Sequence, residues 1–208
     1  MSNIEIEVSI IFVHFSTGDV RSYMATQCLM RFWRLAAKDK TLEIIVINNS
    51  KRDGHFKEIC HKYFENPNNN FGYARNLGAE NAEGKYLCFV DNDIYPDRMF
   101  WGQCKELLEK YPDKKLIATP IYTSCHIPKH NAGFLDGHLL NKRSGSNCLF
   151  MTKETFRNIG KFDETIGRQY VGVEFCNRQI RKGYLVIHTD YALARDIGTY
   201  KYPYAKNL

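Results

Sequence analysis

A short apolar run that ends on three polar residues constrains the fold of this chain more than any other feature. Leu87–Val90 is uninterrupted apolar sequence, and Asp91, Asn92 and Asp93 follow it directly. An apolar run of this length, bounded by a turn signal, is typical of a buried strand in a parallel sheet. Ligands of open α/β sheets bind just beyond the carboxyl ends of such strands. The two carboxylates are therefore expected at a ligand site.

Asp91 and Asp93 have the spacing of a pair that binds one divalent cation. In proteins, Mg²⁺ is usually held by one or two carboxylates, and water and substrate phosphates complete its coordination shell. An isolated Asp-x-Asp is also compatible with a polar turn that only ends a strand. On these residues alone both interpretations stay open.

Segments with strand and helix patterns alternate along the chain. Strands are expected at 7–15, 42–47, 86–90, 116–123, 147–151, 184–188 and 192–194, and helices at 20–38, 55–64, 71–83, 96–111, 152–159 and 172–182. Residues 124–147 lack periodicity and are expected to form a long loop. This alternation predicts βαβ units, and hence an α/β domain with a mostly parallel central sheet and flanking helices.

Composition indicates one soluble, cytoplasmic domain. The chain has 208 residues, of which 44% are hydrophobic and 25% charged, values ordinary for a globular protein. Its seven cysteines are scattered without a Cys-x-x-Cys pair, so free thiols are expected rather than disulfides or a zinc site. No apolar stretch has the length of a transmembrane segment, and the N-terminus lacks the basic region of a signal peptide.

The net charge of +6 lies entirely in the last third of the chain. Residues 138–208 contain 12 Lys and Arg against 6 Asp and Glu, whereas residues 1–137 are balanced. Such an excess suits an anionic partner, either a nucleotide diphosphate or a polyanionic acceptor. A solvated basic face is the alternative.

Four stretches together resemble the family-2 glycosyltransferases, which have the GT-A fold. They are EVSIIFVHF (7–15), EIIVINNSKRDG (43–54), NNNFGYARNLGAENAEGKYLCFVDNDIYP (68–96) and SGSNCLFMTKETFRNIGKFDETI (144–166). The third is the most specific, with the family's glycines, Arg75, Asn76 and the Asp pair in register. The resemblance covers about residues 7–200.

The resemblance implies a single GT-A domain over residues 1–208, with a nucleotide-sugar-binding half at 1–97 and an acceptor-side half at 98–208. It implies sugar transfer from a nucleotide-diphosphate sugar, such as a UDP-sugar, to an acceptor hydroxyl. Mn²⁺ or Mg²⁺ would be held by Asp91 and Asp93 and would bridge the two phosphates. The resemblance also implies that Asn48 and Asn49 contact the nucleobase or ribose, and that Arg75 and Asn76 contact the base or sugar.

Three positions depart from the family pattern. Asn48 stands where the family usually has the uridine-binding aspartate, which weakens the assignment of the nucleobase. The family's Glu-Asp pair, whose Asp deprotonates the acceptor, falls on Val171 and Gly172. Glu174 matches the next acidic position and is the predicted base. The alternatives are that Asp136 or Asp163 is the base, or that the mechanism is different.

The third departure replaces the family's late metal-binding histidine. Arg195 stands in its place, followed by Asp196. Arg195 is therefore predicted to hold the diphosphate, and Asp196 to be a further metal ligand.

Several functions remain compatible with these residues. The first is an active, metal-dependent glycosyltransferase, and the second is a catalytically impaired relative that only binds nucleotide sugars. A nucleotidyltransferase is a third, but 13–21 lack the Gly-rich basic loop that would hold a triphosphate. The acceptor is expected to be a glycan, a protein or a nucleic acid, the last including hydroxymethylated bases of DNA as in bacteriophage DNA modification.

Overall fold

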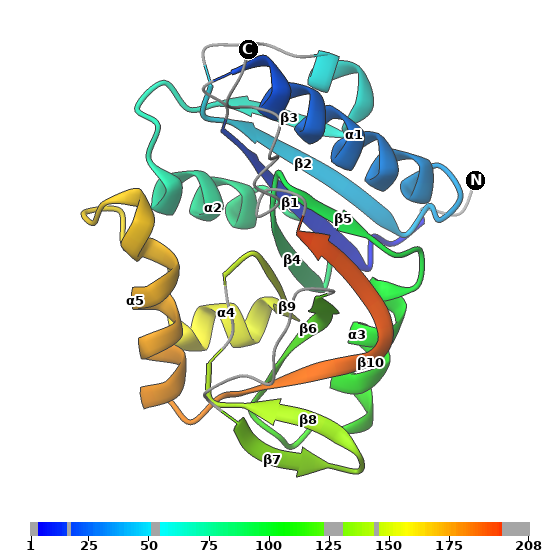
Figure 1. Cartoon of the computed structure of the whole chain (residues 1–208), viewed down its shortest axis with the longest axis vertical. Helices are drawn as coiled ribbons and strands as arrows, with labels where there is room; N and C mark the ends of the chain where they lie inside the picture. Colours follow the sequence, from blue (N-terminus) through cyan, green and yellow to red (C-terminus); the bar gives the residue numbers. More distant parts are fainter. Residues whose placement is uncertain (1–3, 16–17, 51–54, 123–130, 144–145, 197–208) are drawn as a thin grey trace, which may run out of the picture.

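The computed structural model describes residues 4–15, 18–50, 55–122, 131–143 and 146–196; of residues 19–20, 55, 96, 121–122 and 190–196 it describes the backbone only. Within these residues one sheet takes strands from both halves of the chain (Figure 1). The strand order is β3-β2-β1-β4-β9-β6-β10-β8-β7, with β5 paired to β10. The strands are β1 (Val8–His14), β2 (Leu42–Asn48), β3 (Lys62–Glu65), β4 (Tyr86–Asp91), β5 (Ile94–Pro96), β6 (Leu116–Tyr122), β7 (Asn131–Leu135), β8 (His138–Asn141), β9 (Cys148–Thr152) and β10 (Leu185–Asp196).

The α/β class predicted from the sequence is confirmed, and the parallel part of the sheet is its N-terminal half. There β1 is parallel to β2 and β4, and β3 extends this run beyond β2. In the other half β9 lies antiparallel between β4 and β6, and β10 is parallel to β6 but antiparallel to β5 and β8. The second half of the sheet is therefore mixed.

Helices cover both faces of the sheet, which explains the continuous apolar sequence of β1, β2 and β4. The helices are α1 (Asp19–Ala36), α2 (Phe71–Glu80), α3 (Phe100–Lys110), α4 (Lys153–Ile159) and α5 (Arg168–Arg181), with a 3₁₀ helix at His55–Ile59. On one face Ile10 packs with Phe32 of α1. On the other, Ile11 packs with α2, α4 and α5 through residues such as Phe175. Figure 1 shows α1 and α3 on the side away from α2, α4 and α5.

The prediction of a helix at 55–64 was wrong for its second part. The 3₁₀ helix ends at Ile59, and Lys62–Glu65 forms the edge strand β3, paired in parallel with β2 from Ile45↔Lys62 to Asn48↔Glu65. The helix expected at 96–111 starts at Phe100, because Ile94–Pro96 pairs with the end of β10 as β5. In both places long-range strand pairing overrides local helical pattern.

The prediction of a loop throughout 124–147 was wrong for residues 131–141. These form a hairpin of β7 and β8, which are antiparallel with Leu135 opposite His138. Asp136 (φ 48°) and Gly137 (φ 88°) make its turn. Both central residues of this turn have positive φ, and Asp-Gly favours such turns because glycine adopts positive φ without strain. This signal was present in the sequence.

Helix ends and thiols follow the sequence rules. Thr152 caps α4 by accepting a hydrogen bond from the Thr155 N–H at 3.0 Å, and Gly160, with φ 98°, ends the helix as expected. The cysteines that the structure describes are free (Cys28, Cys60, Cys88, Cys104, Cys148 and Cys176). Among the described helices, none combines the length and the apolar character needed to cross a bilayer.

Candidate functional site

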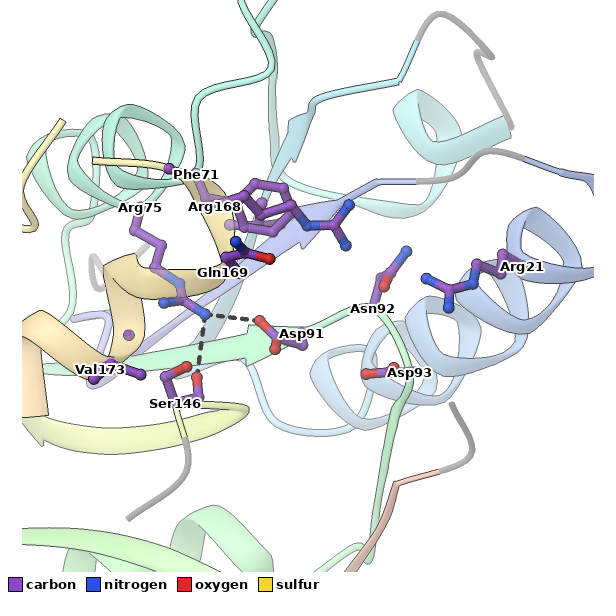
Figure 2. Close-up of a pocket in the computed structure, with 13 residues that line it drawn as sticks. Arg21, Phe71, Arg75, Asp91, Asn92, Asp93, Ser146, Arg168, Gln169 and Val173 are labelled. Atoms are coloured by element: carbon purple, nitrogen blue, oxygen red, sulfur yellow. Dashed lines mark hydrogen bonds and ion pairs between the residues drawn. The ribbon is translucent and has the colours of Figure 1, made fainter. Parts of the chain in front are cut away.

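A cavity of about 550 Å³ opens beyond the carboxyl ends of β1 and β4 (Figure 2). The parallel register sets Val13 of β1 opposite Asp91 of β4, so these two strands end at the same level. The lining residues come from both halves of the chain: Val13, Arg21, Phe71, Arg75, Asp91, Asn92, Asp93, Ser146, Gly167, Arg168, Gln169, Gly172 and Val173. Asp91 and Asp93 thus lie where the sequence pattern places ligand-binding residues.

Arg75 connects α2 to the Asp-Asn-Asp turn. Its Nη2 lies 2.8 Å from Asp91 Oδ1 and donates to the Ser146 carbonyl at 3.2 Å. The guanidinium carbon lies 5.0 Å from the centre of the Phe162 ring, and the side chain is only 4% exposed. α2 can approach the sheet closely because it carries Gly78, where any side chain would overlap Ile11 of β1. This close packing places the Arg75 guanidinium beside Asp91.

Asn92 fixes the turn between the two aspartates. Its Nδ2 donates to the Phe15 carbonyl at 2.8 Å and lies 3.1 Å from His14 Nδ1. His14 is fully buried at the end of β1, and burial lowers its pKa from 6.5 to about 4. A neutral imidazole can accept the Asn92 hydrogen bond, which an imidazolium could not. The carboxylates therefore project from a turn that Asn92 ties to the end of β1.

Two further arginines face the cavity. The Arg168 guanidinium, at the start of α5, lies 3.8 Å from the centre of the Phe15 ring and 4.5 Å from that of Phe71. Arg21 comes from the first turns of α1, and Figure 2 shows the two guanidinium groups pointing toward each other with Asn92 between them. Partial burial, followed by the nearby charge of Arg21, lowers the pKa of Arg168, whereas Asp91 and Asp93 raise it.

The sequence prediction missed Arg21 and Arg168. The helix containing Arg168 was expected to begin only at 172, but α5 starts at Arg168 itself. A cation in the first turn of a helix opposes the helix dipole. This placement becomes visible only once the start of α5 is known, so the sequence alone contained no signal for Arg168.

Asn48 and Asn49 lie at the end of β2, outside the residues that line the cavity. Asn48 Nδ2 donates to the Tyr63 hydroxyl at 2.9 Å, and its Oδ1 accepts from the Ser50 N–H at 2.9 Å. Asn49 Oδ1 accepts from Asn66 Nδ2 at 2.8 Å, while its own buried Nδ2 has no partner among the described residues. Their contact with a nucleobase stays a prediction.

Asn76 joins α2 to the segment before α5. Its Nδ2 donates to the Phe162 carbonyl (2.9 Å) and to Glu164 Oε1 (2.7 Å), and its Oδ1 accepts from the Phe162 N–H (2.9 Å). Asn76 is 2% exposed and does not line the cavity. Its hydrogen bonds hold two segments together, and its predicted contact with substrate is not among them.

Glu174 lies on α5, one residue after the cavity-lining Val173. Both of its carboxylate oxygens accept from Arg178, at 2.6 and 2.7 Å. Arg178 also donates to the Ile159 carbonyl at 3.1 Å and so links α5 to the end of α4. Glu174 is outside the lining residues, and its role as the base stays a prediction.

The alternative bases also lie outside the lining residues. Asp136 accepts from the Tyr111 hydroxyl at 2.8 Å, and this bond lowers its pKa. Asp163 accepts from the Thr165 hydroxyl at 2.7 Å and from the Thr165 N–H, which lowers its pKa likewise. Gly172, where the family has its aspartate, does line the cavity and packs against Ser146.

Arg195 and Asp196 are described by their backbone only. β10 brings them next to the site, since Arg195 pairs with Tyr95 and Asp196 with Ile94, the residue after Asp93. Residues more than a hundred positions apart in the chain thus meet at the Asp-Asn-Asp turn. Their predicted roles lie in side chains outside the described residues.

The side chains that could ligate a metal at this turn suit a hard divalent cation. Asp91 and Asp93 line the same cavity with carboxylate oxygens, which Mg²⁺ and Mn²⁺ prefer. Groups of three or more metal-binding side chains do not occur among the described residues. Two carboxylates are nevertheless sufficient where substrate phosphates and water complete the coordination.

Part of the sequence is similar to known glycosyltransferases. An uncharacterized glycosyltransferase of Rickettsia felis is 38% identical over 69 residues, which are 29% of this chain and 12% of that protein. Glycosyltransferase GlyA of Streptococcus pneumoniae is 37% identical over 62 residues, 26% of this chain and 9% of that protein. The chain spans about a tenth of the length of these curated relatives.

Solved structures agree over nearly the whole chain. GalNAc-T7 with UDP, GalNAc and Mn²⁺ has a TM-score of 0.68 at 14% identity, covering 92% of this chain and 43% of that one. TarS 1–349 of S. aureus has a TM-score of 0.68 at 13% identity, covering 91% of this chain and 60% of that one. At such identities the likeness shows the fold, which is GT-A. The family model "Glycosyl transferase family 2" matches residues 23–149, more than half of the sequence, and the chain therefore belongs to glycosyl transferase family 2.

Proposed function

We propose that this chain is a metal-dependent glycosyltransferase that moves a sugar from a nucleotide-diphosphate sugar to an acceptor hydroxyl. The observation that carries the proposal is the cavity at the ends of β1 and β4, where two carboxylates and three guanidinium groups face one space. A cation held by carboxylates suits the donor diphosphate, and arginines suit the phosphate oxygens of a substrate. Family membership supports the same reaction.

On the donor side, Asp91 and Asp93 would hold Mn²⁺ or Mg²⁺. Such a cation stabilises the negative charge that develops on the departing diphosphate. Arg75 keeps Asp91 in place through its 2.8 Å ion pair, and Asn92 keeps the turn against β1. These residues orient the donor before the reaction, which lowers the entropic part of the barrier.

In the transfer step, the acceptor oxygen forms a bond to the anomeric carbon of the donor sugar. The bond from that carbon to the phosphate oxygen breaks, and the nucleoside diphosphate leaves with the electron pair. The hydroxyl proton passes to a base, for which Glu174 is the predicted residue. UDP is the first nucleotide to test, although Asn48 in place of the usual aspartate leaves other bases open.

A panel of nucleotide sugars tests the proposal directly. Thermal unfolding of the protein is measured with each nucleotide sugar, with and without Mn²⁺, and donors that raise Tm are assayed for release of the nucleoside diphosphate. We expect at least one donor to stabilise the protein only with the cation, because binding to the folded state raises Tm. If no nucleotide sugar shifts Tm under either condition, the proposal fails.

A catalytically impaired nucleotide-sugar-binding relative is the second candidate. The observation that favours it is Gly172, which lies at the cavity in the position of the family's acidic residue. Donor hydrolysis separates the two candidates. Slow release of sugar with Mn²⁺ supports an active enzyme, whereas binding without any release supports the impaired relative.

The acceptor is proposed to be a glycan or a hydroxymethylated base of DNA. Lys142 and Lys182 are exposed on the acceptor-side half, as a nucleic-acid surface requires, while Arg178 pairs with Glu174. Incubation with hydroxymethylated DNA and the stabilising donor, followed by digestion to nucleosides and mass spectrometry, tests DNA. A sugar-mass adduct on a base supports DNA, and its absence leaves a glycan or a protein as the acceptor. Steep weakening of DNA binding with salt would accompany a true DNA substrate.

A further inference from the structure

Arg21 and Arg168 form a pair of like charges on the side of the cavity away from the Arg75–Asp91 ion pair (Figure 2). Among the residues that the structure describes, neither guanidinium has a carboxylate partner within ion-pair distance, whereas Arg75 does. Two cations that face one space repel each other unless an anion lies between them. An arginine pair in this arrangement therefore marks a position for an oxyanion.

Aromatic rings hold Arg168 in this position without neutralising it. The guanidinium carbon lies 3.8 Å from the centre of the Phe15 ring, and Phe71 flanks it at 4.5 Å. Stacking on aromatic faces stabilises a guanidinium and leaves its N–H groups, which lie in the plane of the guanidinium, available as donors. The residue is exposed to solvent and lines the cavity. It is thus fixed in orientation and still accessible to a ligand.

The backbone at the same place adds donors of the same kind. Gly167, Arg168 and Gln169 line the cavity at the beginning of α5, a helix of 14 residues, and no side chain caps this end. The first N–H groups of a helix have no partner within it and carry partial positive charge. Together with the two guanidinium groups they suit the several oxygens of one phosphate.

The charge balance of the cavity indicates a second anion in addition to the donor. Among the described residues, its charged lining consists of Arg21, Arg75, Arg168, Asp91 and Asp93, which leaves one positive charge in excess. A divalent cation and the diphosphate of a nucleotide sugar roughly cancel each other. The excess positive charge therefore remains when the donor is bound, and it lies on the side of the cavity formed by Arg21 and Arg168. Arg168 belongs to the acceptor-side half of the chain.

We propose that Arg21, Arg168 and the first N–H groups of α5 bind a phosphate group of the acceptor, while Asp91 and Asp93 serve the donor. This inference rests on the proposed transferase function and adds a substrate class to it: an acceptor with a phosphate near the hydroxyl that receives the sugar. Arginine suits this role because its planar fork binds two phosphate oxygens at once. The two anions of the reaction then occupy separate sides of one cavity.

Calorimetric titration of inorganic phosphate into protein saturated with UDP and Mg²⁺ tests the inference. Should the donor panel identify another nucleotide, its diphosphate replaces UDP. The wild type is expected to bind phosphate with the nucleotide in place. Arg168→Gln and Arg21→Gln are each expected to weaken phosphate binding about tenfold or more, as for a lost hydrogen bond to a charged group. Their affinity for UDP with Mg²⁺ should remain unchanged.

Two exposed arginines on the same helices provide matched controls. Arg34 lies in the last turn of α1 and Arg181 in the last turn of α5, and the controls are Arg34→Gln and Arg181→Gln. Each removes one positive charge from the helix concerned, far from the cavity, and should leave phosphate binding intact. A Tm close to that of the wild type shows that each variant is folded. If one of the cavity variants does not fold, the other still tests the site.

Several results would overturn the inference. Competition between phosphate and UDP, or a loss of UDP affinity in Arg168→Gln, would assign both arginines to the donor diphosphate. If the complex of the protein with UDP and Mg²⁺ does not bind phosphate, the cavity has no site for a second anion. If no nucleotide binds at all, the proposed function fails, but phosphate titration of the nucleotide-free protein and its two variants still shows whether the arginine pair binds an oxyanion.

Discussion

Gly172 of α5 lies so close to Ser146 that a Cβ on the glycine would overlap both Oγ and Cβ of the serine. Arg75 Nη1 would lie 3.7 Å from the same Cβ, and the Ser146 carbonyl accepts from Arg75 Nη2 at 3.2 Å. The position at which the family has its acidic residue is thus occupied by a packed contact between α5 and the residues before β9. A side chain there would push against the group that holds Arg75 beside Asp91.

The first prediction concerns this contact. Gly172→Ala is expected to destabilise the protein by about 1–3 kcal/mol, as for overpacking of a well-packed site. Adding Ser146→Gly, which removes the overlapping atoms, should recover most of that loss. Denaturant unfolding of the two single variants and the double variant measures the coupling between the two sites.

Gly102 supplies the matched control for Gly172. It is the third residue of α3, and a Cβ there would meet nothing within 4 Å. Gly102→Ala should therefore stabilise the protein by about 0.5–1 kcal/mol, since alanine is the better helix former. Equal effects of alanine at the two glycines would contradict the packing argument.

The second prediction concerns Glu174. Because both of its oxygens accept from Arg178, Glu174→Gln is expected to lower stability by about 1 kcal/mol or less, as for a partly exposed i,i+4 pair. As the predicted general base, Glu174 should be needed for turnover, which is expected to fall by about two to four decades in Glu174→Gln with donor affinity unchanged. Near-normal turnover would show that Glu174 acts only through its pair with Arg178.

The sequence was sufficient for the parts of the fold that depend on local pattern. The apolar runs of β1, β2 and β4 and the Thr152 cap of α4 are written in consecutive residues. The strands β3 and β5 were not predicted because each is short and exists through pairing with a distant partner. β5, for example, forms only where Ile94 meets Asp196. No local window contains that information.

The residues of the candidate site likewise fall into those that a local motif predicted and those that it did not. Asp91, Asp93 and Arg75 share one motif, and the structure brings all three to one cavity. Arg21 and Arg168 belong to no motif, and they meet only because α1 and α5 begin at the same edge of the sheet. Asn76, although inside the motif, forms its hydrogen bonds with Phe162 and Glu164. Motif membership alone therefore does not distinguish a substrate contact from a structural one.

The third prediction concerns pH. His188 is 5% exposed, with Nε2 at 2.5 Å from Asn141 Nδ2, and burial lowers its pKa from 6.5 to about 4. Above pH 6.5 the imidazole is neutral in both the folded and the unfolded chain, so its titration does not lower the free energy of unfolding there. As the pH falls from 6.5 to about 4, only the unfolded chain gains the proton, and stability decreases.

This loss should reach about 3 kcal/mol at the lower end, at about 1.4 kcal/mol per pKa unit. His14 has the same shift and adds a loss of the same sign. Urea unfolding at pH 7.5 and 5 measures the part of this loss that occurs above pH 5, about 2 kcal/mol for each histidine. His188→Gln should reduce the difference between the two pH values, because the amide accepts the Asn141 hydrogen bond without titrating. An unchanged pH dependence in that variant would show that His188 does not titrate in this way.

The fourth prediction concerns the metal. Asp93 lines the cavity at the end of the turn that Asn92 ties to β1, and its carboxylate is one of the two proposed to hold the cation. Asp93→Asn keeps the size of the side chain but removes the charge that a hard cation requires. We expect the variant to keep its fold, to lose transfer activity and to lose the Mn²⁺-dependent rise in Tm on addition of donor. Asp113→Asn, an exposed aspartate at the far end of α3, should behave as the wild type in both assays. Full activity of Asp93→Asn that also resists EDTA would show that the reaction requires neither this carboxylate nor the cation. Loss of activity in both aspartate variants would point to a general charge effect rather than to metal binding.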